Sequence, residues 1–198
     1  MVEPEIPRVP EPADRELLLL TMNFYRDAEL RGARLLMNLH RHLLDGDSQM
    51  KLSRHLADEV RHAWLWTQRI GELGGMPIAI DSGYQRRMGK RAGVPRDVTE
   101  LLALTLVAER RAIDRYREHA SRPDVDEGTL AVLNSVTADE QWHLDWVEGK
   151  LRALSEHRGG AKYVADLVQR YEAIDREVYA SLQADEARWA DGQRRQSL

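Results

Sequence analysis

Apolar residues recur every three or four positions along most of the chain, which is the spacing of one face of an α-helix. The first such stretch runs from about Asp14, a suitable N-cap, to about Leu44. Asp45-Gly46-Asp47-Ser48 follows it. We expect Gly46 to end this helix in the left-handed conformation, and Asp47 or Ser48 to cap the next helix.

The same periodicity predicts four further helices. The second extends to about Leu73, where Gly74-Gly75-Met76-Pro77 ends it. Residues 74–96 are expected to form one long irregular connection. An Asp-x-x-Glu capping pattern at 97–100 opens a third helix that ends near Ala120, and a short turn leads to a fourth over residues 125–156. A fifth follows Gly159-Gly160 and extends to about residue 187.

Short, long and short connections between the first four helices predict two antiparallel hairpins joined by a crossover, which is a topology of four-helix bundles. The predicted fold is therefore all-α, with the bundle over residues 13–157 and a C-terminal fifth helix and tail over residues 158–198. Residues 1–12 hold four of the seven prolines, and we expect them to form a flexible arm.

The composition agrees with helices and argues against several classes of protein. Charged residues make up 31% of the chain and aromatic residues 6%. The absence of cysteine excludes disulfides and iron–sulfur clusters and fits a reducing cytoplasm, where we expect the protein. The apolar run Leu17–Leu20 is too short to span a membrane, and the net charge of -4 argues against a nucleic-acid partner.

Two copies of one short motif lie in the second and fourth predicted helices: Asp58-Glu59-Val60-Arg61-His62 and Asp139-Glu140-Gln141-Trp142-His143. A Glu and a His three positions apart share one face of a helix, so each copy directs a carboxylate and an imidazole to one spot. A single Glu-x-x-His is common by chance. Two copies with the same preceding Asp indicate a paired site.

A lone glutamate in each of the other two helices completes the pattern. Residues equidistant from a tight turn lie at the same depth in a hairpin, so Glu29 is level with Glu59, and Glu109 with Glu140. Glu29 and Glu109 also lie in similar local sequences 80 positions apart. The chain therefore carries a two-fold repeat in which four Glu and two His converge in the middle of the bundle.

Buried, unpaired carboxylates destabilise a protein by several kcal/mol each, and two divalent cations would cancel four such charges. Carboxylate and imidazole ligands without sulfur suit iron, manganese or a mixed pair, with zinc as a contaminant. Asp58 is placed to accept a hydrogen bond from His143, and Asp139 from His62, which would orient each imidazole. The alternative is that these residues are solvated charges and ordinary core histidines.

Over about residues 14–157, the pattern Glu, Glu-x-x-His, Glu, Glu-x-x-His resembles the ferritin-like di-iron carboxylate superfamily, which includes bacterioferritins and rubrerythrins. The local match is to bacterioferritin, around residues 139–146 and 58–77. The resemblance implies six metal ligands, with Glu59 and Glu140 bridging: Glu29, Glu59, His62, Glu109, Glu140 and His143.

The chain departs from these relatives in three places. Bacterioferritin binds haem through a methionine directly after the second-helix Glu, and here that position is Val60, so we predict no haem. Leu36 replaces the tyrosine that ferritins often carry two turns after the first Glu. The cysteine-rich domain of rubrerythrins is missing, so reducing electrons would come from another protein or from iron.

Four further residues lie near the predicted ligands along their helices. His55, one turn before Glu59, is either an additional ligand, a proton relay or an interior histidine. Tyr25 and Tyr116 either donate a hydrogen bond to a ligand, lend an electron, or pack in the core. Thr105, one turn before Glu109, either orients bound oxygen or packs between helices.

Basic residues crowd the predicted crossover: Arg86, Arg87, Lys90, Arg91 and Arg96. They form either a solvated loop or a docking patch for an acidic carrier protein or a phosphate-bearing substrate. The amphipathic fifth helix either caps the bundle or pairs with a second copy, and we expect a homo-oligomer, a dimer at least.

A di-metal centre of this kind reduces O2 or peroxide by two electrons. In the hypothesis we favour, Fe(II) or an electron carrier is oxidised, as in ferroxidases and rubrerythrin-like peroxidases. In the second, the chain is an oxygenase that hydroxylates or desaturates an organic or carrier-bound substrate. In the third, it stores or sequesters metal without catalysis.

Overall fold

The computed structural model describes residues 12–156 and 160–196 of the chain. Within these residues it contains six helices and no strand, which confirms the all-α prediction. They are α1 (Pro12–Leu39), α2 (Gly46–Glu72), α3 (Tyr84–Ala92), α4 (Val98–Ala120), α5 (Glu127–Ser155) and α6 (Gly160–Gln196). None of these helices is long and apolar enough to cross a membrane.

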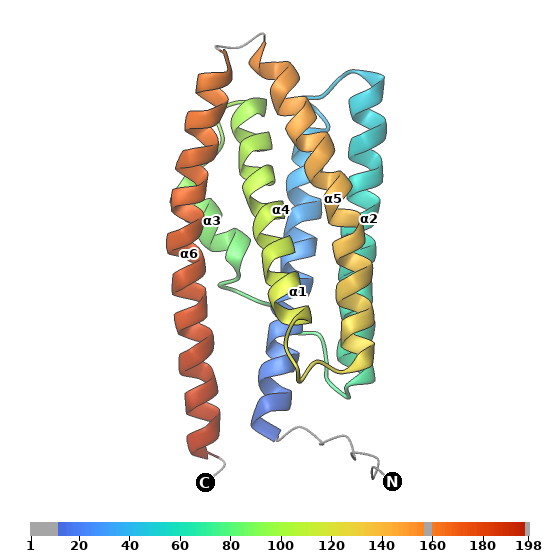
Figure 1. Ribbon diagram of the computed structural model, residues 1–198, viewed down its shortest axis with the longest axis vertical. Helices are drawn as coiled ribbons and strands as arrows, with labels where there is room; N and C mark the ends of the chain where they lie inside the picture. Colours follow the sequence, from blue (N-terminus) through green and yellow to red (C-terminus); the bar gives the residue numbers. More distant parts are fainter. Residues whose placement is uncertain (1–11, 157–159, 197–198) are drawn as a thin grey trace.

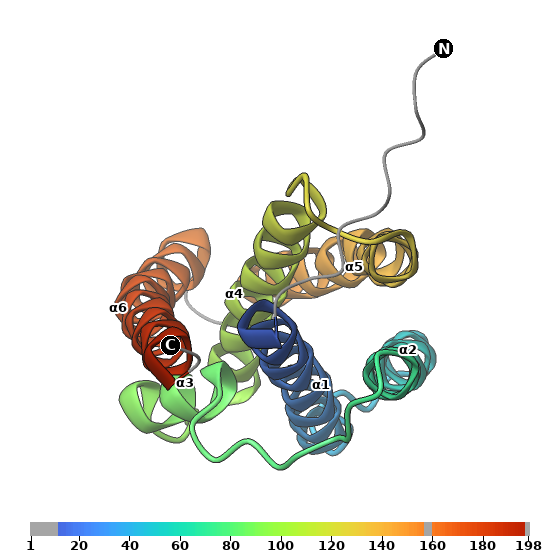
Figure 2. The ribbon, with the colours of Figure 1, turned by 90° about the horizontal axis from the view of Figure 1, so that it is seen from below.

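Helices α1, α2, α5 and α4 form the bundle (Figure 1). Viewed along the helices, α1 and α2 make one antiparallel hairpin, and α4 and α5 make the other (Figure 2). Helix α6 lies outside the bundle against α4, and α3 lies against α6 and α1. The two predicted hairpins and their long crossover are therefore present.

The turn between α1 and α2 differs from the prediction. Helix α1 ends at Leu39 rather than near Leu44, and Gly46 is the first residue of α2 rather than a left-handed terminator. Asp45, in extended conformation, is the N-cap, because its carboxylate accepts a hydrogen bond of 2.9 Å from the backbone N–H of Ser48. The prediction that Asp47 or Ser48 caps α2 was wrong.

Residues 74–96 are not wholly irregular as predicted, because they contain the short helix α3. Its residues Tyr84, Met88 and Ala92 are spaced four apart and buried, while the positions between them are mostly basic or polar. Gly93, with φ of 77°, ends the helix in the left-handed region where glycine is favoured. The segment was predicted to be irregular because its apolar residues are few, although three of them form the buried face of α3.

The other helix ends agree more closely with the sequence. Asp97 caps α4 by accepting from the N–H groups of Thr99 and Glu100, at 2.8 and 3.0 Å. The side chain of Glu100 turns back to the N–H of Arg96, one residue before the cap. Helix α6 continues past residue 187 to Gln196. The predicted N-terminal arm, apart from Pro12, lies outside the described residues.

The bundle core consists of two apolar clusters separated by a polar layer. One cluster includes Leu36, Leu102 and Val147 and continues onto α6. The other includes Met22, Trp66 and Leu133. The layer between them contains buried Glu and His side chains from all four bundle helices. The polar layer therefore has an apolar cluster on each side along the bundle.

Candidate di-metal centre

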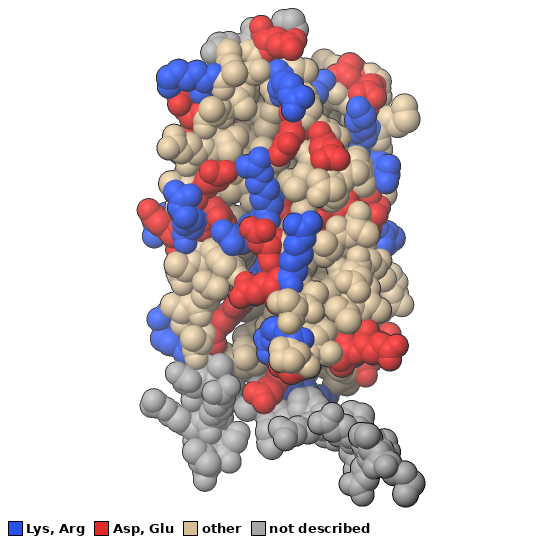
Figure 3. Space-filling model, in the orientation of Figure 1, with Lys and Arg blue, Asp and Glu red and all other residues tan. Residues whose placement is uncertain are grey.

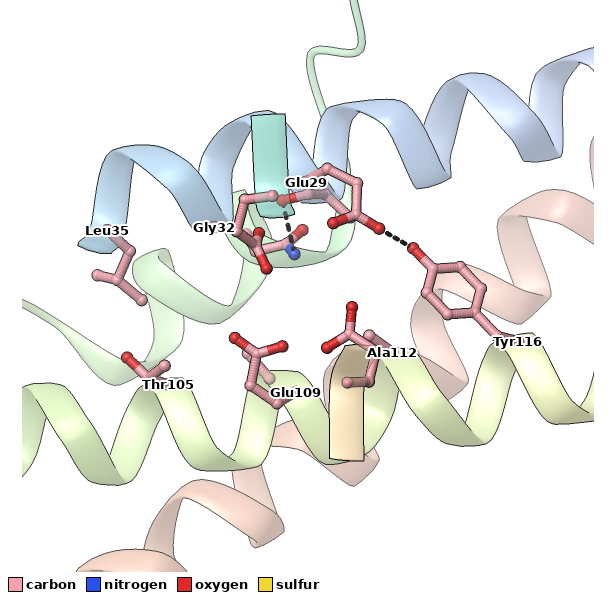
Figure 4. Close-up of a pocket in the computed structure, with 12 residues that line it drawn as sticks. Glu29, Gly32, Leu35, Thr105, Glu109, Ala112 and Tyr116 are labelled. Carbon is pink, nitrogen blue, oxygen red and sulfur yellow. Dashed lines mark hydrogen bonds between the residues drawn. The ribbon is translucent and has the colours of Figure 1, made fainter. Parts of the chain in front are cut away.

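All six predicted ligands lie in the polar layer. Each is at most 7% exposed, and His62 and His143 are fully buried. The hairpin geometry explains this arrangement, because α1 brings Glu29 level with the motif of α2, and α4 brings Glu109 level with the motif of α5. Figure 4 shows Glu29 of α1 and Glu109 of α4 facing the same cavity.

The donor atoms form two groups, each with all of its atoms within 4.8 Å of one another. We call the group of Glu29, Glu59, His62 and Glu140 the Glu29 half-site. The group of His55, Glu59, Glu109 and His143 is the Glu109 half-site. Glu59 belongs to both, and Glu140 also reaches both histidines.

The contacts of Glu140 connect the two half-sites. One carboxylate oxygen lies 3.4 Å from Nδ1 of His62, and the other lies 3.0 Å from Nδ1 of His143. Nδ1 of His62 is also 3.5 Å from Oε2 of Glu29 and has no hydrogen-bond partner. A buried nitrogen without a partner, aimed among carboxylates, fits a metal ligand.

The two aspartates hold the outer nitrogens of the histidines, as the sequence predicted. Nε2 of His62 lies 3.2 Å from Oδ2 of Asp139, and Nε2 of His143 lies 3.3 Å from Oδ2 of Asp58. A carboxylate acceptor keeps a proton on Nε2, so Nδ1, which faces the glutamates, is the nitrogen that can give up a proton and offer its lone pair to a cation. Each histidine is thereby oriented by the opposite hairpin.

The charges in the layer shift the pKa values of its members. Burial raises the pKa of Glu59 well above its usual value, and the charges of Glu109, Glu29 and Glu140 raise it further. Burial would raise the pKa of Glu140 too, but its contacts with His143 and His62 hold it below the usual value. Without metal, protons reduce the negative charge of the buried glutamates, and bound cations would compensate the same charge.

Protons also occupy the Glu29 half-site at the imidazole of His62. Burial opposes its charged form, but the carboxylates of Glu140 and Glu29 outweigh burial and raise the pKa of His62 to about 11. Two divalent cations would replace these protons, and the oxygen-rich donor set suits iron or manganese. The residues present therefore fit a pair of metal ions.

Two of the four additional candidates reach the ligands. Tyr116 donates a hydrogen bond to Oε1 of Glu29, as Figure 4 shows. Nε2 of His55 lies 3.2 Å from Oε1 of Glu109 and 3.3 Å from Oε1 of Glu59, and its ring stacks on His143. The structure thus leaves His55 with two possible roles, that of ligand and that of hydrogen-bond donor.

The other two candidates make different contacts. The hydroxyl of Tyr25 pairs with Nδ1 of His119 at 3.1 Å rather than with a predicted ligand. Burial, reinforced by Arg122 and Arg115, lowers the pKa of His119 to about 4, so this ring is neutral at pH 7. Thr105 donates to the backbone carbonyl of Leu101 at 2.9 Å, although its side chain also lines the cavity.

Sequence reasoning missed three residues at the site. Arg61 pairs with Asp139 and lies 3.5 Å from Asp58, so one guanidinium holds both aspartates. Trp146 donates its indole N–H to Nδ1 of His55 at 3.1 Å. A Cβ at Gly32 would overlap the carboxylate of Glu59. Only Arg61, within the first Glu-x-x-His motif, gave a hint of its place.

A small cavity adjoins the carboxylates between α1 and α4 (Figure 4). Besides Glu29, Glu59, Glu109, Glu140 and Tyr116, small side chains line much of it: Ala28, Gly32, Thr105, Ala108 and Ala112. Gln85 of α3 also lines it and donates to the carbonyl of Ala28 at 3.1 Å. Its volume of about 30 Å³ suits a diatomic molecule or one or two waters.

The basic residues near α3 are partly paired within the chain. Arg87 contacts Asp185, and Arg91 contacts Glu177, each at 2.5 Å across to α6. Lys90 is exposed, and Arg86 donates to the carbonyl of Asp81 at 2.6 Å. Acidic and basic side chains also intermix over α4, α5 and α6 (Figure 3). Docking of an acidic partner at residues 86–91 stays a prediction.

Comparisons with known proteins agree with this geometry. Residues 36–156 match the model of the ferritin-like domain family. A bacterioferritin of Streptomyces coelicolor is 33% identical over 138 residues, which are 67% of this chain and 78% of the relative. For a bacterioferritin of Mycobacterium avium the identity is 30%, over 67% of this chain and 82% of the relative.

A solved structure shares the fold over nearly the whole chain. It is a protein of Synechococcus described as having aldehyde deformylating oxidase activity, with a TM-score of 0.72. The match covers 91% of this chain and 82% of that chain at 22% sequence identity, so it supports the fold alone. The family model and the bacterioferritins lead to one assignment: this chain belongs to the ferritin-like family.

Proposed function

We propose that this protein is an iron-dependent oxidase that transfers electrons from two bound metal ions to O2 or peroxide, without an organic substrate. The observation that carries the proposal is the size of the cavity at the carboxylates, about 30 Å³. Within its present walls this volume suits O2, peroxide or water and is too small for a long fatty chain. The similarity to bacterioferritins supports iron as the metal.

The residues divide into clear roles in this proposal. Glu29 and His62 would hold one ion, Glu109 and His143 would hold the other, and Glu59 and Glu140, which contact residues of both half-sites, would serve both. Two iron(II) ions bound there would supply two electrons, which with two protons are enough to reduce O2 to hydrogen peroxide, or hydrogen peroxide to two waters. Asp58 and Asp139 orient the imidazoles, and Tyr116 holds Glu29 by a hydrogen bond.

The main competing function is that of an oxygenase acting on an organic substrate. It would require the cavity to enlarge, for example by displacement of Gln85, which lines the cavity and donates to the carbonyl of Ala28. Metal storage is the other competing function, and it would require the protein to retain many more than two ions per chain.

The test is anaerobic loading of the purified protein with Fe(II), followed by mixing with O2. We expect two Fe(II) bound per chain and oxidation of two Fe(II) per O2 consumed, measured by an oxygen electrode and iron(III) absorbance. The matched control is Glu72→Gln, at a carboxylate that is 61% exposed and far from the layer, and it should behave as the wild type.

Three outcomes would contradict the proposal. The first is a chain that binds no iron. The second is O2 consumption that begins only when an organic substrate is added, which favours the oxygenase. The third is retention of many ferric ions per chain after oxidation, measured by elemental analysis of the gel-filtered protein, which favours storage.

A further inference from the structure

Three fully buried histidines point at the carboxylates of the polar layer, and they do so in two different ways. His62 and His143 direct Nδ1 inward and Nε2 at an aspartate. His55 directs Nε2 inward, and its Nδ1 meets the indole N–H of Trp146 at 3.1 Å. The partner of the outer nitrogen is an acceptor in two cases and a donor in the third.

This difference fixes which inward nitrogen has a free lone pair. An indole N–H only donates, so Nδ1 of His55 must accept, and in the neutral ring the proton then lies on Nε2. His62 and His143 also carry a proton on Nε2, but for them that nitrogen faces outward. When His62 and His143 act as ligands, Nδ1 of each must be unprotonated, so with cations bound only His55 presents a protonated nitrogen to the site.

We propose that Trp146 withholds His55 from the metal and makes it the hydrogen-bond donor of Glu109, a role parallel to that of Tyr116 toward Glu29. The inference rests on the proposed di-metal site. The Nε2–H group points between Glu109 and Glu59 and is aligned with neither, so a small rotation of the Glu109 carboxylate completes the bond. His55 is then a positioning residue, and Trp146 limits each metal to one imidazole.

The restriction has a chemical consequence for metal choice. One imidazole and several carboxylates per ion form an oxygen-rich set that suits iron or manganese, whereas a further imidazole strengthens zinc binding. Removal of the indole N–H frees Nδ1 of His55 to carry the proton and Nε2 to bind metal. Trp146 therefore acts on selectivity without touching the ions.

The test counts imidazole ligands by X-ray absorption on protein loaded with cobalt(II). We expect two imidazoles per pair of ions in the wild type and three in Trp146→Phe. The control His55→Val should also give two. It places valine at position 55, as at the repeat-related position, Val136. In a competition experiment, the ratio of zinc affinity to iron(II) affinity should rise by about tenfold in Trp146→Phe. Three imidazoles in the wild type, or two in Trp146→Phe, would overturn the inference.

A second measurement uses the metal-free protein and does not depend on loading. Nitrogen-15 NMR should show Nδ1 of His55 unprotonated in the wild type, with its resonance shifted toward the protonated form in Trp146→Phe. A protonated Nδ1 in the wild type would overturn the inference. Failure to bind cobalt at all would instead contradict the proposed function, which separates the two.

Discussion

The Glu29 half-site and the Glu109 half-site have matching ligands, but the residues around them differ. Positions related by the repeat hold different side chains: Tyr25 and Thr105, Gly32 and Ala112, Leu36 and Tyr116, His55 and Val136. Yet each lone glutamate has a donor nearby, Tyr116 for Glu29 and His55 for Glu109. Different residues have come to perform equivalent roles in the two halves.

The contacts that orient the two ligand histidines and support the two lone glutamates cross from one hairpin to the other. Asp139 of α5 orients His62 of α2, and Asp58 of α2 orients His143 of α5. Tyr116 of α4 serves Glu29 of α1, and His55 of α2 faces Glu109 of α4. Neither hairpin can therefore assemble a complete half-site by itself, and the centre depends on docking of the two hairpins.

The largest expected effect is loss of metal, and it should be greater for a carboxylate shared by both half-sites than for one that serves a single half-site. Glu59→Gln removes a ligand common to both groups, so we expect it to abolish binding of both ions. Glu109→Gln should leave one ion, in the Glu29 half-site. Metal content after dialysis checks both variants. Equal losses in the two would show that the half-sites do not bind separately.

The next effect concerns the aspartates. Asp139→Asn should weaken binding in the Glu29 half-site by about 10- to 100-fold, because His62 loses the carboxylate that fixes its tautomer. Asp58→Asn should do the same in the Glu109 half-site. Calorimetric titration with cobalt(II) measures both, with exposed Asp47→Asn as the control. If Asp139→Asn weakened only the His143 side, the crossed pairing would be wrong.

Gly32 and Ala112 provide a matched pair at a smaller scale. Gly32→Ala should weaken metal binding on the order of tenfold, about 1.4 kcal/mol, because the new Cβ displaces the end of the Glu59 side chain. The fold should be stabilised by about 0.5–1 kcal/mol, since alanine favours a helix interior. Ala112→Gly should do the reverse, losing stability and retaining metal. Thermal unfolding and cobalt(II) titration separate the two quantities.

The smallest expected effect is the pH dependence of metal affinity. It is measured in Glu109→Gln, where only the Glu29 half-site should bind an ion. The pKa of His62 is raised to about 11, so its imidazole carries a proton at neutral pH that a cation must displace. In Glu109→Gln, apparent affinity should therefore rise with pH between 6 and 8, by up to about tenfold per pH unit for each proton released. Titrations in buffers of different ionisation enthalpy count the protons. No release would contradict the protonated His62.

Much of the site followed from the sequence because it depends on local periodicity. The levels of Glu29, Glu59, Glu109 and Glu140 require only helical rise and two tight turns, and the structure places all four in one layer. The crossed Asp–His pairs followed from the same symmetry. Helix α3 was missed because its buried face consists of three residues among charged neighbours.

The sequence by itself determined which side chains can meet, since residue type and helical spacing fix their level in the bundle. Only the tertiary structure decided which of the additional candidates near the ligands reach the carboxylates. Tyr25 lies one turn from Glu29 and Tyr116 two turns from Glu109 in sequence, yet the nearer tyrosine contacts His119 and the farther one contacts Glu29 of the other hairpin. The direction of His55 likewise depends on Trp146, a residue 91 positions away that packing brings against its ring.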